Sequence, residues 1–266
     1  MKLRRWTSTA AAVAVLLGLS SLTGAASASA EEAAATGYVA LGDSYSSGVG
    51  AGDYSGGDCK RSAHAYPNLW NAANSPSSFD FTACSGARTD DVLAGQLGPL
   101  SSSTGLVSIS IGGNDAGFAD TMTTCVTQGE SACLARVQEA RDYVENTLPG
   151  KLDGVYDAIA QRAPAAKVVV LGYPHIYQLD GGCIVGISEK SRAAINSASD
   201  ALDEATAKRA ADHGFSFGDV RPTFSGHEIC SDDEWLHSVT FPIDESYHPT
   251  AAGQSGGYLP VLEGLA

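Results

Sequence analysis

The sequence predicts an α/β fold in which a central, mainly parallel sheet of five strands carries helices on both faces. Short apolar or β-branched runs, each the length of a fully buried strand, recur along the chain. Between them lie longer segments with apolar residues at three- and four-residue intervals, the spacing of a helix that packs on one side. Strand and helix in alternation predict a parallel sheet, because each new strand must start from the same edge.

The first thirty residues are typical of a secretory signal peptide. Three basic residues open the chain, residues 10–19 are apolar, and Ala28-Ser29-Ala30 is a small-residue cleavage site. We expect cleavage near this site, or as late as about residue 36, and one domain over residues 37–266. The apolar run is shorter than the ~20 residues of a membrane span. The sequence therefore predicts an exported protein without stable membrane insertion.

The strands and helices follow in order along the remaining chain. The expected strands are Tyr38–Leu41, Phe79–Ala83, Leu106–Ile111, Lys167–Leu171 and Phe215–Phe217. The expected helices are Ala63–Ala73, Ala132–Arg162, Ser188–Ala211 and Thr250–Leu265. Pro149-Gly150 should break or kink the second helix, and Gly214 follows the third where a C-terminal glycine belongs.

The charge balance argues against nucleic acid as a partner. Without the signal peptide the chain keeps 13 basic and 30 acidic residues, a net charge of −17. We expect no binding to nucleic acid or to anionic membranes through this charge. The acidic residues are dispersed, which indicates a solvated surface and not an acidic cleft.

Six cysteines in an exported chain indicate disulfides. No C-x-x-C or His-Glu-x-x-His spacing is present, so we expect no metal site. Fifteen pairings are possible, and the sequential one is the simplest: Cys59–Cys84, Cys125–Cys133 and Cys183–Cys230. Closing loops of a few tens of residues would stabilise the fold by roughly 3 to 4 kcal/mol each.

Residues suited to acyl transfer follow the predicted strands. Ser44 lies directly after the first strand, Gly86 after the second, Asn114 after the third, and His248 beyond the fifth. The carboxyl ends of the strands meet at one edge of such a sheet, so these residues should converge there. Ser44 is the candidate nucleophile and His248 the candidate general base. The main-chain N–H groups of Ser44 and Gly86 and the Asn114 amide are candidate oxyanion donors.

Plainer interpretations exist for each of these residues taken alone. Asn114 could be an ordinary turn residue, Gly86 a loop glycine, and His248 the cap of the last helix. Two rival motifs are also present. Gly253–Gly257 matches the G-x-S-x-G nucleophile elbow around Ser255, but no strand precedes it and no histidine follows it. Gly48–Gly52 lacks the lysine of a phosphate-binding loop, and we expect it to be a flexible loop that faces the substrate.

Four sequence blocks resemble those of the GDSL or SGNH hydrolase family. They are residues 42–48 (GDSYSSG), 85–87 (SGA), 112–115 (GGND) and 248–250 (HPT). The resemblance covers nearly the whole mature chain and is strongest to secreted actinomycete lipases and phospholipases A1. It implies a three-layer α/β/α fold of flavodoxin-like order without metal or cofactor. It also implies Ser44 as nucleophile, His248 as base, and Ser44, Gly86 and Asn114 as oxyanion donors.

The group that orients the histidine departs from the usual family pattern. Many members carry aspartate three residues before the histidine, where this chain has Glu245. Some secreted actinomycete members use a main-chain carbonyl two residues before the histidine instead, which corresponds to Ser246. We favour the carbonyl of Ser246, with the Glu245 carboxylate as the alternative.

The expected function is a secreted, monomeric carboxylic ester hydrolase that acts on acyl esters of lipids. Phospholipase A1 and carbohydrate-ester deacetylase activities are alternatives, and a secreted lipid- or carbohydrate-binding module is the non-enzyme alternative. An acyl groove is expected from apolar residues in the loops after the strands. These residues are Tyr45, Phe118, Ile176, Tyr177, Ile184, Val185 and Ile187.

Overall fold

The computed structural model describes residues 37–183 and 186–266. The expected signal peptide lies outside these residues. Five parallel strands form the central sheet in the order β4-β1-β5-β6-β7. Counted along the chain this is the order 2-1-3-4-5, the flavodoxin-like arrangement. The strands are β1 (Gly37–Gly42), β4 (Phe79–Phe81), β5 (Thr104–Ser110), β6 (Lys167–Leu171) and β7 (Ser216–Gly218). The predicted fold class is therefore confirmed.

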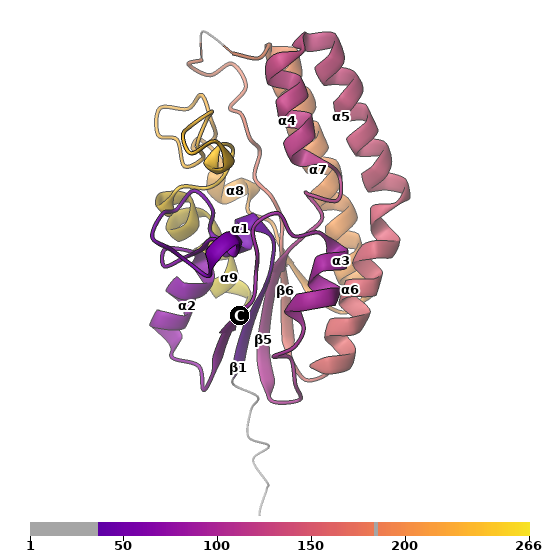
Figure 1. Ribbon diagram of the computed structural model, residues 1–266, viewed down its shortest axis with the longest axis vertical. Coiled ribbons are helices and arrows are strands. Elements are labelled where there is room, and N and C mark those ends of the chain that lie inside the picture. Colours follow the sequence, from indigo (N-terminus) through magenta and orange to yellow (C-terminus); the bar gives the residue numbers. More distant parts are fainter. Residues whose placement is uncertain (1–36, 184–185) are drawn as a thin grey trace, which may run out of the picture. The chain divides into compact units, whose positions relative to one another are not determined.

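Helices cover both faces of the sheet, which makes three layers (Figure 1). One face carries α2 (Tyr66–Asn74) and α9 (Leu259–Leu265), which pack against each other. The other carries α5 (Gly129–Asn146), α6 (Leu148–Arg162) and α7 (Glu189–Asp212). The other α-helices and strands are α1 (Ser44–Ser47), β2 (Tyr54–Ser55), β3 (Arg61–Ser62), α3 (Thr89–Asp91), α4 (Phe118–Thr127) and α8 (Arg221–Phe224).

The sheet is buried on both sides, as a parallel sheet requires. All six residues of β1 are buried, and so are four of the five residues of β6. Tyr38 on β1 is fully buried, and its hydroxyl forms a 2.7 Å hydrogen bond with the Ser108 hydroxyl of β5. No helix of the described residues is both long enough and apolar enough to cross a membrane.

Two of the expected helices divide in the structure. The segment expected at Ala132–Arg162 forms α5 and α6, which meet at Thr147. Pro149 lies in the first turn of α6, where its missing N–H removes no helical hydrogen bond. The segment expected at Thr250–Leu265 forms a π-helical turn over Gly253–Tyr258 and then α9. Gly257 is needed in that turn, because a Cβ there would lie 2.1 Å from the Phe224 ring.

Helix α4 was not expected from the sequence. It contains four threonines, and β-branched residues have low helix propensity. Three of its hydroxyls donate to the carbonyl one turn earlier, from Thr121 at 2.9 Å, Thr123 at 2.9 Å and Thr127 at 2.7 Å. The helix gains its stability from packing, since Thr121, Met122 and Cys125 are buried against its neighbours.

Three disulfides join Cys59 to Cys84, Cys125 to Cys133 and Cys183 to Cys230, the sequential pairing. The first connects the loop after β1 to the loop after β4. The second connects α4 to α5. The described residues hold no free cysteine.

Candidate active site

Ser44 lies at the start of α1, directly after the tight turn that ends β1. Asp43 caps this helix, and its Oδ1 accepts a 3.0 Å hydrogen bond from the N–H of Tyr45. Gly42 has a φ of +124°, and a Cβ there would lie 2.5 Å from the Ser110 carbonyl oxygen. The turn therefore requires glycine for both its backbone angle and its contact with β5. It presents the Ser44 side chain at the carboxyl end of the sheet.

His248 contacts both Ser44 and a main-chain carbonyl. Its Nε2 lies 2.8 Å from Ser44 Oγ, and its Nδ1 lies 3.0 Å from the Ser246 carbonyl oxygen. A carbonyl can only accept, so Nδ1 carries the proton and Nε2 is left to accept from the Ser44 hydroxyl. Burial lowers the pKa of His248 from its ordinary 6.5 to about 4, against the opposing effect of the Ser246 carbonyl. The imidazole is therefore neutral near pH 7.

The acidic residues before His248 bond elsewhere. Glu245 Oε1 accepts a 2.9 Å hydrogen bond from the Tyr54 hydroxyl, whose oxygen in turn accepts from the N–H of Gly50 at 2.8 Å. Asp244 forms an ion pair with Lys60, which lowers the pKa of the Asp244 carboxyl. In this geometry the Ser246 carbonyl, and neither carboxylate, contacts the imidazole Nδ1.

The glycine-rich loop Gly48–Gly52 supports the histidine from behind. A Cβ on Gly50 would lie 3.1 Å from His248 Cβ and 2.7 Å from the Pro249 carbonyl oxygen. None of the five residues lines the cavity beside Ser44. The expectation that this loop faces the substrate is wrong, because its glycines allow a close approach to the histidine segment instead.

Tyr247, the residue directly before His248, holds the backbone of this segment in place. Its φ of +64° is the left-handed region, which costs a non-glycine residue about 1–2 kcal/mol. Its carbonyl accepts a 2.6 Å hydrogen bond from the buried Tyr45 hydroxyl, and its N–H donates to the His237 carbonyl at 2.9 Å. The sequence predicts Tyr45 in the acyl groove and does not predict this contact. The one feature of the sequence that could have indicated this contact is the position of Tyr45 next to Ser44.

Gly86 and Asn114 come together beside Ser44. Gly86 has a φ of +76°, which suits glycine, and Ser85 N–H donates to the Cys59 carbonyl at 3.1 Å. Asn114 Nδ2 donates to the Ala87 carbonyl at 3.1 Å, which connects the two loops. Within residues 37–183 and 186–266, the N–H groups of Ser44 and Gly86 have no hydrogen-bond acceptor. Both donors are available to a ligand.

The Tyr173 hydroxyl connects two of the four sequence blocks, through Asp43 of the first and Gly113 of the third. The Tyr173 hydroxyl donates to Asp43 Oδ2 at 2.6 Å and accepts from the N–H of Gly113 at 3.3 Å. Burial raises the pKa of Asp43 to about 7, although the Tyr173 and Tyr45 hydrogen bonds oppose this shift. Tyr173 follows β6, and its role was not expected from the sequence.

A cavity of about 450 Å³ opens beside these groups. Its polar end contains Ser44, Gly86, Asn114 and His248. Its apolar walls come from α4 and from the segment before His248. They include Phe118, Met122, Val126, Val239, Ile243 and Tyr247. Five sequence-predicted site residues, the four at the polar end and Ser246, therefore line one cavity whose other walls are mostly apolar.

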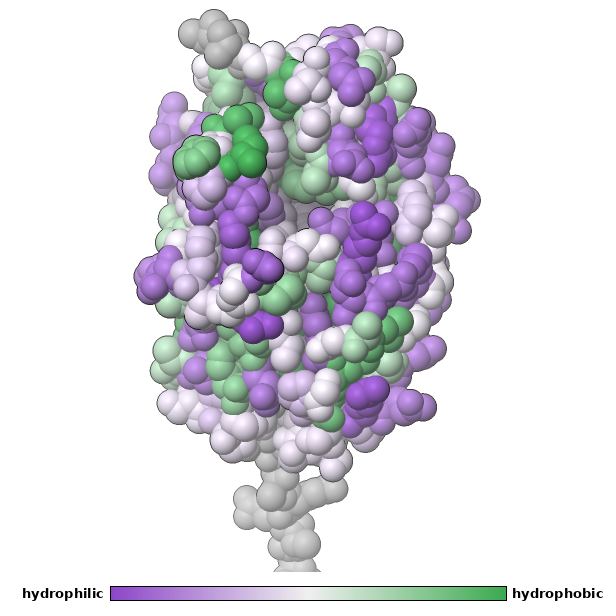
Figure 2. All heavy atoms as spheres, viewed as in Figure 1, coloured by the Kyte–Doolittle hydropathy of each residue, from purple (hydrophilic) through white to green (hydrophobic). Residues whose placement is uncertain are grey.

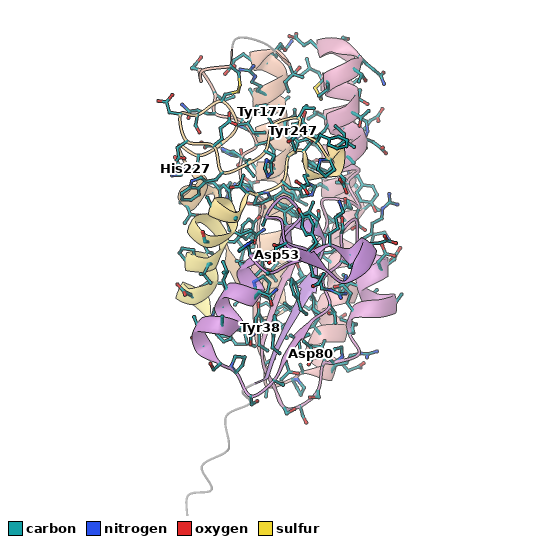
Figure 3. The ribbon with its side chains drawn as sticks, turned by 60° about the vertical axis from the view of Figure 1, so that its left-hand side comes forward. Tyr38, Asp53, Asp80, Tyr177, His227 and Tyr247 are labelled. Atoms are coloured by element: carbon teal, nitrogen blue, oxygen red, sulfur yellow. A yellow bond between two sulfur atoms is a disulfide. The ribbon has the colours of Figure 1, made fainter. Side chains whose placement is uncertain are left out.

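Only part of the expected acyl groove lies at this cavity. Phe118 lines it, whereas Tyr45 and Ile176 are buried around a small hollow of about 30 Å³ behind Ser44. Tyr177 and Ile187 line a neighbouring cavity of about 180 Å³. Tyr247 borders both larger cavities, and its ring centroid lies 6.5 Å from that of Tyr177 (Figure 3). Ile184 and Val185 lie outside the described residues.

Ser255, the serine of the rival motif, lies elsewhere. It is exposed, its hydroxyl donates to the Ala252 carbonyl at 3.3 Å, and it does not line the cavity. Across residues 37–183 and 186–266, no group of three or more His, Cys, Asp or Glu side chains could hold a metal ion. The candidate chemistry is that of Ser44, His248, Asn114 and main-chain amides.

Comparison with known proteins places this geometry in a family. The model of the GDSL-like Lipase/Acylhydrolase family matches residues 40–255. Lipase 1 of Streptomyces coelicolor is 70% identical over 256 residues, which are 95% of each chain. The crystal structure of an extracellular lipase from Streptomyces rimosus matches with a TM-score of 0.85 at 68% identity, covering 87% of this chain and 100% of that one. Phospholipase A1 from Streptomyces albidoflavus matches with a TM-score of 0.85 at 64% identity, covering 87% and 99%.

Proposed function

The chain belongs to the GDSL-like lipase/acylhydrolase family and is a carboxylic ester hydrolase, and we propose that it cleaves acyl esters of lipids through a Ser44–His248 pair. The observation that carries this proposal is the 2.8 Å contact between Ser44 Oγ and His248 Nε2 at the polar end of the cavity. A nucleophile needs a base within hydrogen-bond reach, and here the base, His248, is oriented by the Ser246 carbonyl.

Acylation begins when Ser44 Oγ attacks the carbonyl carbon of the ester. His248 Nε2 takes the hydroxyl proton as the new C–O bond forms, and the Ser246 carbonyl accepts from Nδ1–H of the imidazolium. The carbonyl oxygen becomes an oxyanion, to which the N–H groups of Ser44 and Gly86 and the Asn114 amide donate. His248 then gives its proton to the alcohol oxygen, the ester C–O bond breaks, and the alcohol leaves.

Deacylation repeats these steps with water. His248 Nε2 removes a proton from water, whose oxygen attacks the acyl-serine carbonyl. The second oxyanion uses the same three donors, and Ser44 leaves with the proton from His248. The fatty acid departs and the free enzyme is restored.

The apolar walls of the cavity support an acyl chain as the substrate group held there. Phe118, Met122 and Val126 on α4 lie along one wall, and Val239 and Ile243 contribute to the rim. A site for an acyl group is mostly apolar and carries a few polar groups at the reacting end. Triacylglycerols and phospholipids both offer such a chain. A phospholipase A1 activity is the second candidate, which the likeness to the Streptomyces albidoflavus enzyme favours.

A serine-directed phosphonate separates Ser44 from every other serine. We expect it to label Ser44 in the wild-type chain and to abolish hydrolysis of a soluble nitrophenyl ester. Ser44→Ala should lose both the label and nearly all turnover, with an unchanged thermal unfolding transition. Ser255→Ala is the matched control and should keep both. Full turnover in Ser44→Ala would disprove the assignment, and so would labelling at Ser255.

We also propose that the protein is exported. The matching Streptomyces rimosus structure is described as an extracellular lipase, and residues 1–30 have the pattern of a secretory signal. Mass spectrometry of the protein from culture medium would give the mature N-terminus. We expect it between residues 31 and 37.

A further inference from the structure

Large apolar side chains are exposed beside the mouth of the catalytic cavity. Phe241 is 93% exposed, Ile243 67%, Val239 55% and Val126 47%. In the described residues, only Leu93 and Leu179 among other large hydrophobic side chains are comparably exposed. Val126, Val239 and Ile243 line the cavity, and Phe241 lies between two of them in sequence. Figure 2 shows hydrophobic side chains gathered at the upper left, on the side of the C-terminal loops.

These four residues are here called the apolar rim. Val126 lies near the end of α4, and the other three come from a loop that is fastened at its base. The Thr240 N–H donates to Ser246 Oγ at 3.0 Å, and the Ser246 N–H donates to the Ile243 carbonyl at 3.1 Å. Asp244 pairs with Lys60 on a distant loop. Phe241 is thus presented to solvent by a segment with defined contacts. Scattered single exposed hydrophobic residues are ordinary, but a group around a cavity mouth marks an interaction site.

We propose that the apolar rim docks onto the surface of an aggregated zwitterionic lipid and brings the cavity mouth against it. This inference rests on the proposed function, because the rim continues into the cavity that contains Ser44. An acyl chain could then pass from the lipid surface to the apolar wall without crossing water. The net charge of −17 without the expected signal peptide opposes anionic surfaces, and Lys60 pairs with Asp244, the acidic residue that follows Ile243 in the chain.

Vesicle binding tests the rim without any turnover. In a Ser44→Ala background, the protein should sediment with phosphatidylcholine vesicles. Adding Phe241→Ser should lower its vesicle partition coefficient roughly tenfold, because one aromatic side chain no longer enters the lipid. Leu93→Ser is the control, because Leu93 is exposed but does not line the cavity. Phe241→Trp keeps the apolar contact and should bind as well as the parent. Its fluorescence should shift to the blue and be quenched by brominated lipid.

Two substrates distinguish failure of the rim from failure of the proposed function. On a monomeric short-chain ester, Phe241→Ser should keep kcat/KM within twofold of the wild type. On phosphatidylcholine vesicles its rate should fall roughly tenfold. If the wild type hydrolyses neither substrate, the proposed function fails, and vesicle binding still tests the rim.

Three results would overturn the rim proposal. The first is equal vesicle binding by Phe241→Ser and its parent. The second is binding to anionic but not to zwitterionic vesicles. The third is a dimer of the wild type that Phe241→Ser converts to monomer on a sizing column, which would make the rim a contact between two copies of this chain.

Discussion

At the scale of single residues, the proton on Nδ1 determines what His248 can do. The Ser246 carbonyl accepts this proton at 3.0 Å, so Nε2 is free to act as a base toward Ser44 at 2.8 Å. A carbonyl orients the imidazole, but it stabilises the imidazolium less than a carboxylate would. The Glu245 carboxylate is occupied by Tyr54. The candidate catalytic unit is therefore a pair with a main-chain support.

Glu245→Gln should leave most of the activity, because a glutamine oxygen can still accept from the Tyr54 hydroxyl and the main chain at Ser246 is unchanged. We expect kcat/KM on a soluble ester to fall less than tenfold, or about 1.4 kcal/mol in the barrier. Asp244→Asn is the matched control, one residue away. A thousandfold loss in Glu245→Gln alone would identify Glu245 as the third member of a triad.

Asn114→Ala should lower kcat by roughly 10² to 10³, the cost of one oxyanion donor, with little change in KM. The side chain is held by its 3.1 Å hydrogen bond to the Ala87 carbonyl, so its second amide proton is free to point into the cavity. Initial rates on a soluble ester measure the effect. A rise in KM with an unchanged kcat would show that Asn114 acts only in substrate binding.

At the scale of elements, the loops that follow β1, β4 and β5 are joined to one another. The Cys59–Cys84 disulfide and the hydrogen bond from Ser85 N–H to the Cys59 carbonyl hold the Gly86 loop against the loop after β1. The Tyr173 hydroxyl connects Asp43 to Gly113. The position of each candidate oxyanion donor thus depends on a neighbouring element.

Removing the Cys59–Cys84 disulfide should lower kcat at least tenfold as well as stability by roughly 3 kcal/mol. The double variant Cys59→Ser/Cys84→Ser tests this, with urea unfolding and initial rates as the measurements. The matched control is Cys125→Ser/Cys133→Ser, since that disulfide joins α4 to α5 and does not touch the Gly86 loop. The control should lose stability but keep kcat on a short soluble ester. Equal losses of kcat in both variants would contradict a specific role for the first disulfide.

At the scale of the whole molecule, burial acts in opposite directions on two ionisable groups of the site. It lowers the pKa of His248 to about 4 and raises that of Asp43 to about 7. Between pH 6.5 and 4 the unfolded His248 takes a proton before the folded one, so this residue destabilises the fold as pH falls. Asp43 has the opposite effect on stability. As pH falls from 7, its folded carboxyl takes a proton before the unfolded one, so this residue stabilises the fold.

The acid limb of kcat/KM should therefore lie well below pH 6.5, toward pH 4, since the base is lost only when folded His248 becomes protonated. Initial rates on a soluble ester from pH 3.5 to 8 measure it, before any slow unfolding. The variant Asp43→Asn identifies any contribution of Asp43 to this profile. If the wild type shows a change of kcat/KM near pH 7 and Asp43→Asn does not, that change comes from the Asp43 carboxyl. An acid limb at the ordinary histidine value of 6.5 would contradict the prediction.

The sequence by itself determined the fold class and the loops that hold the site. Buried strands are short apolar runs, and that signal is local, so all five strands of the sheet were predicted near their observed bounds. Ser44, Gly86 and Asn114 were also predicted as candidate site residues from local signals, since each follows a strand. Helix α4 was not predicted, because its threonines have low helix propensity and the helix is stabilised by packing instead.

Only the tertiary structure decided how the site is held and what borders it. Tyr173 bonds to Asp43, 130 residues away in the sequence, and Tyr45 bonds to the Tyr247 carbonyl, 202 residues away. No local sequence pattern predicts such contacts. The contact of His248 with the Ser246 carbonyl spans the left-handed backbone at Tyr247, whose carbonyl is held by the Tyr45 hydroxyl. The apolar rim likewise exists only because folding brings α4 and the segment before His248 to the same cavity, since side chains far apart in sequence meet only through packing.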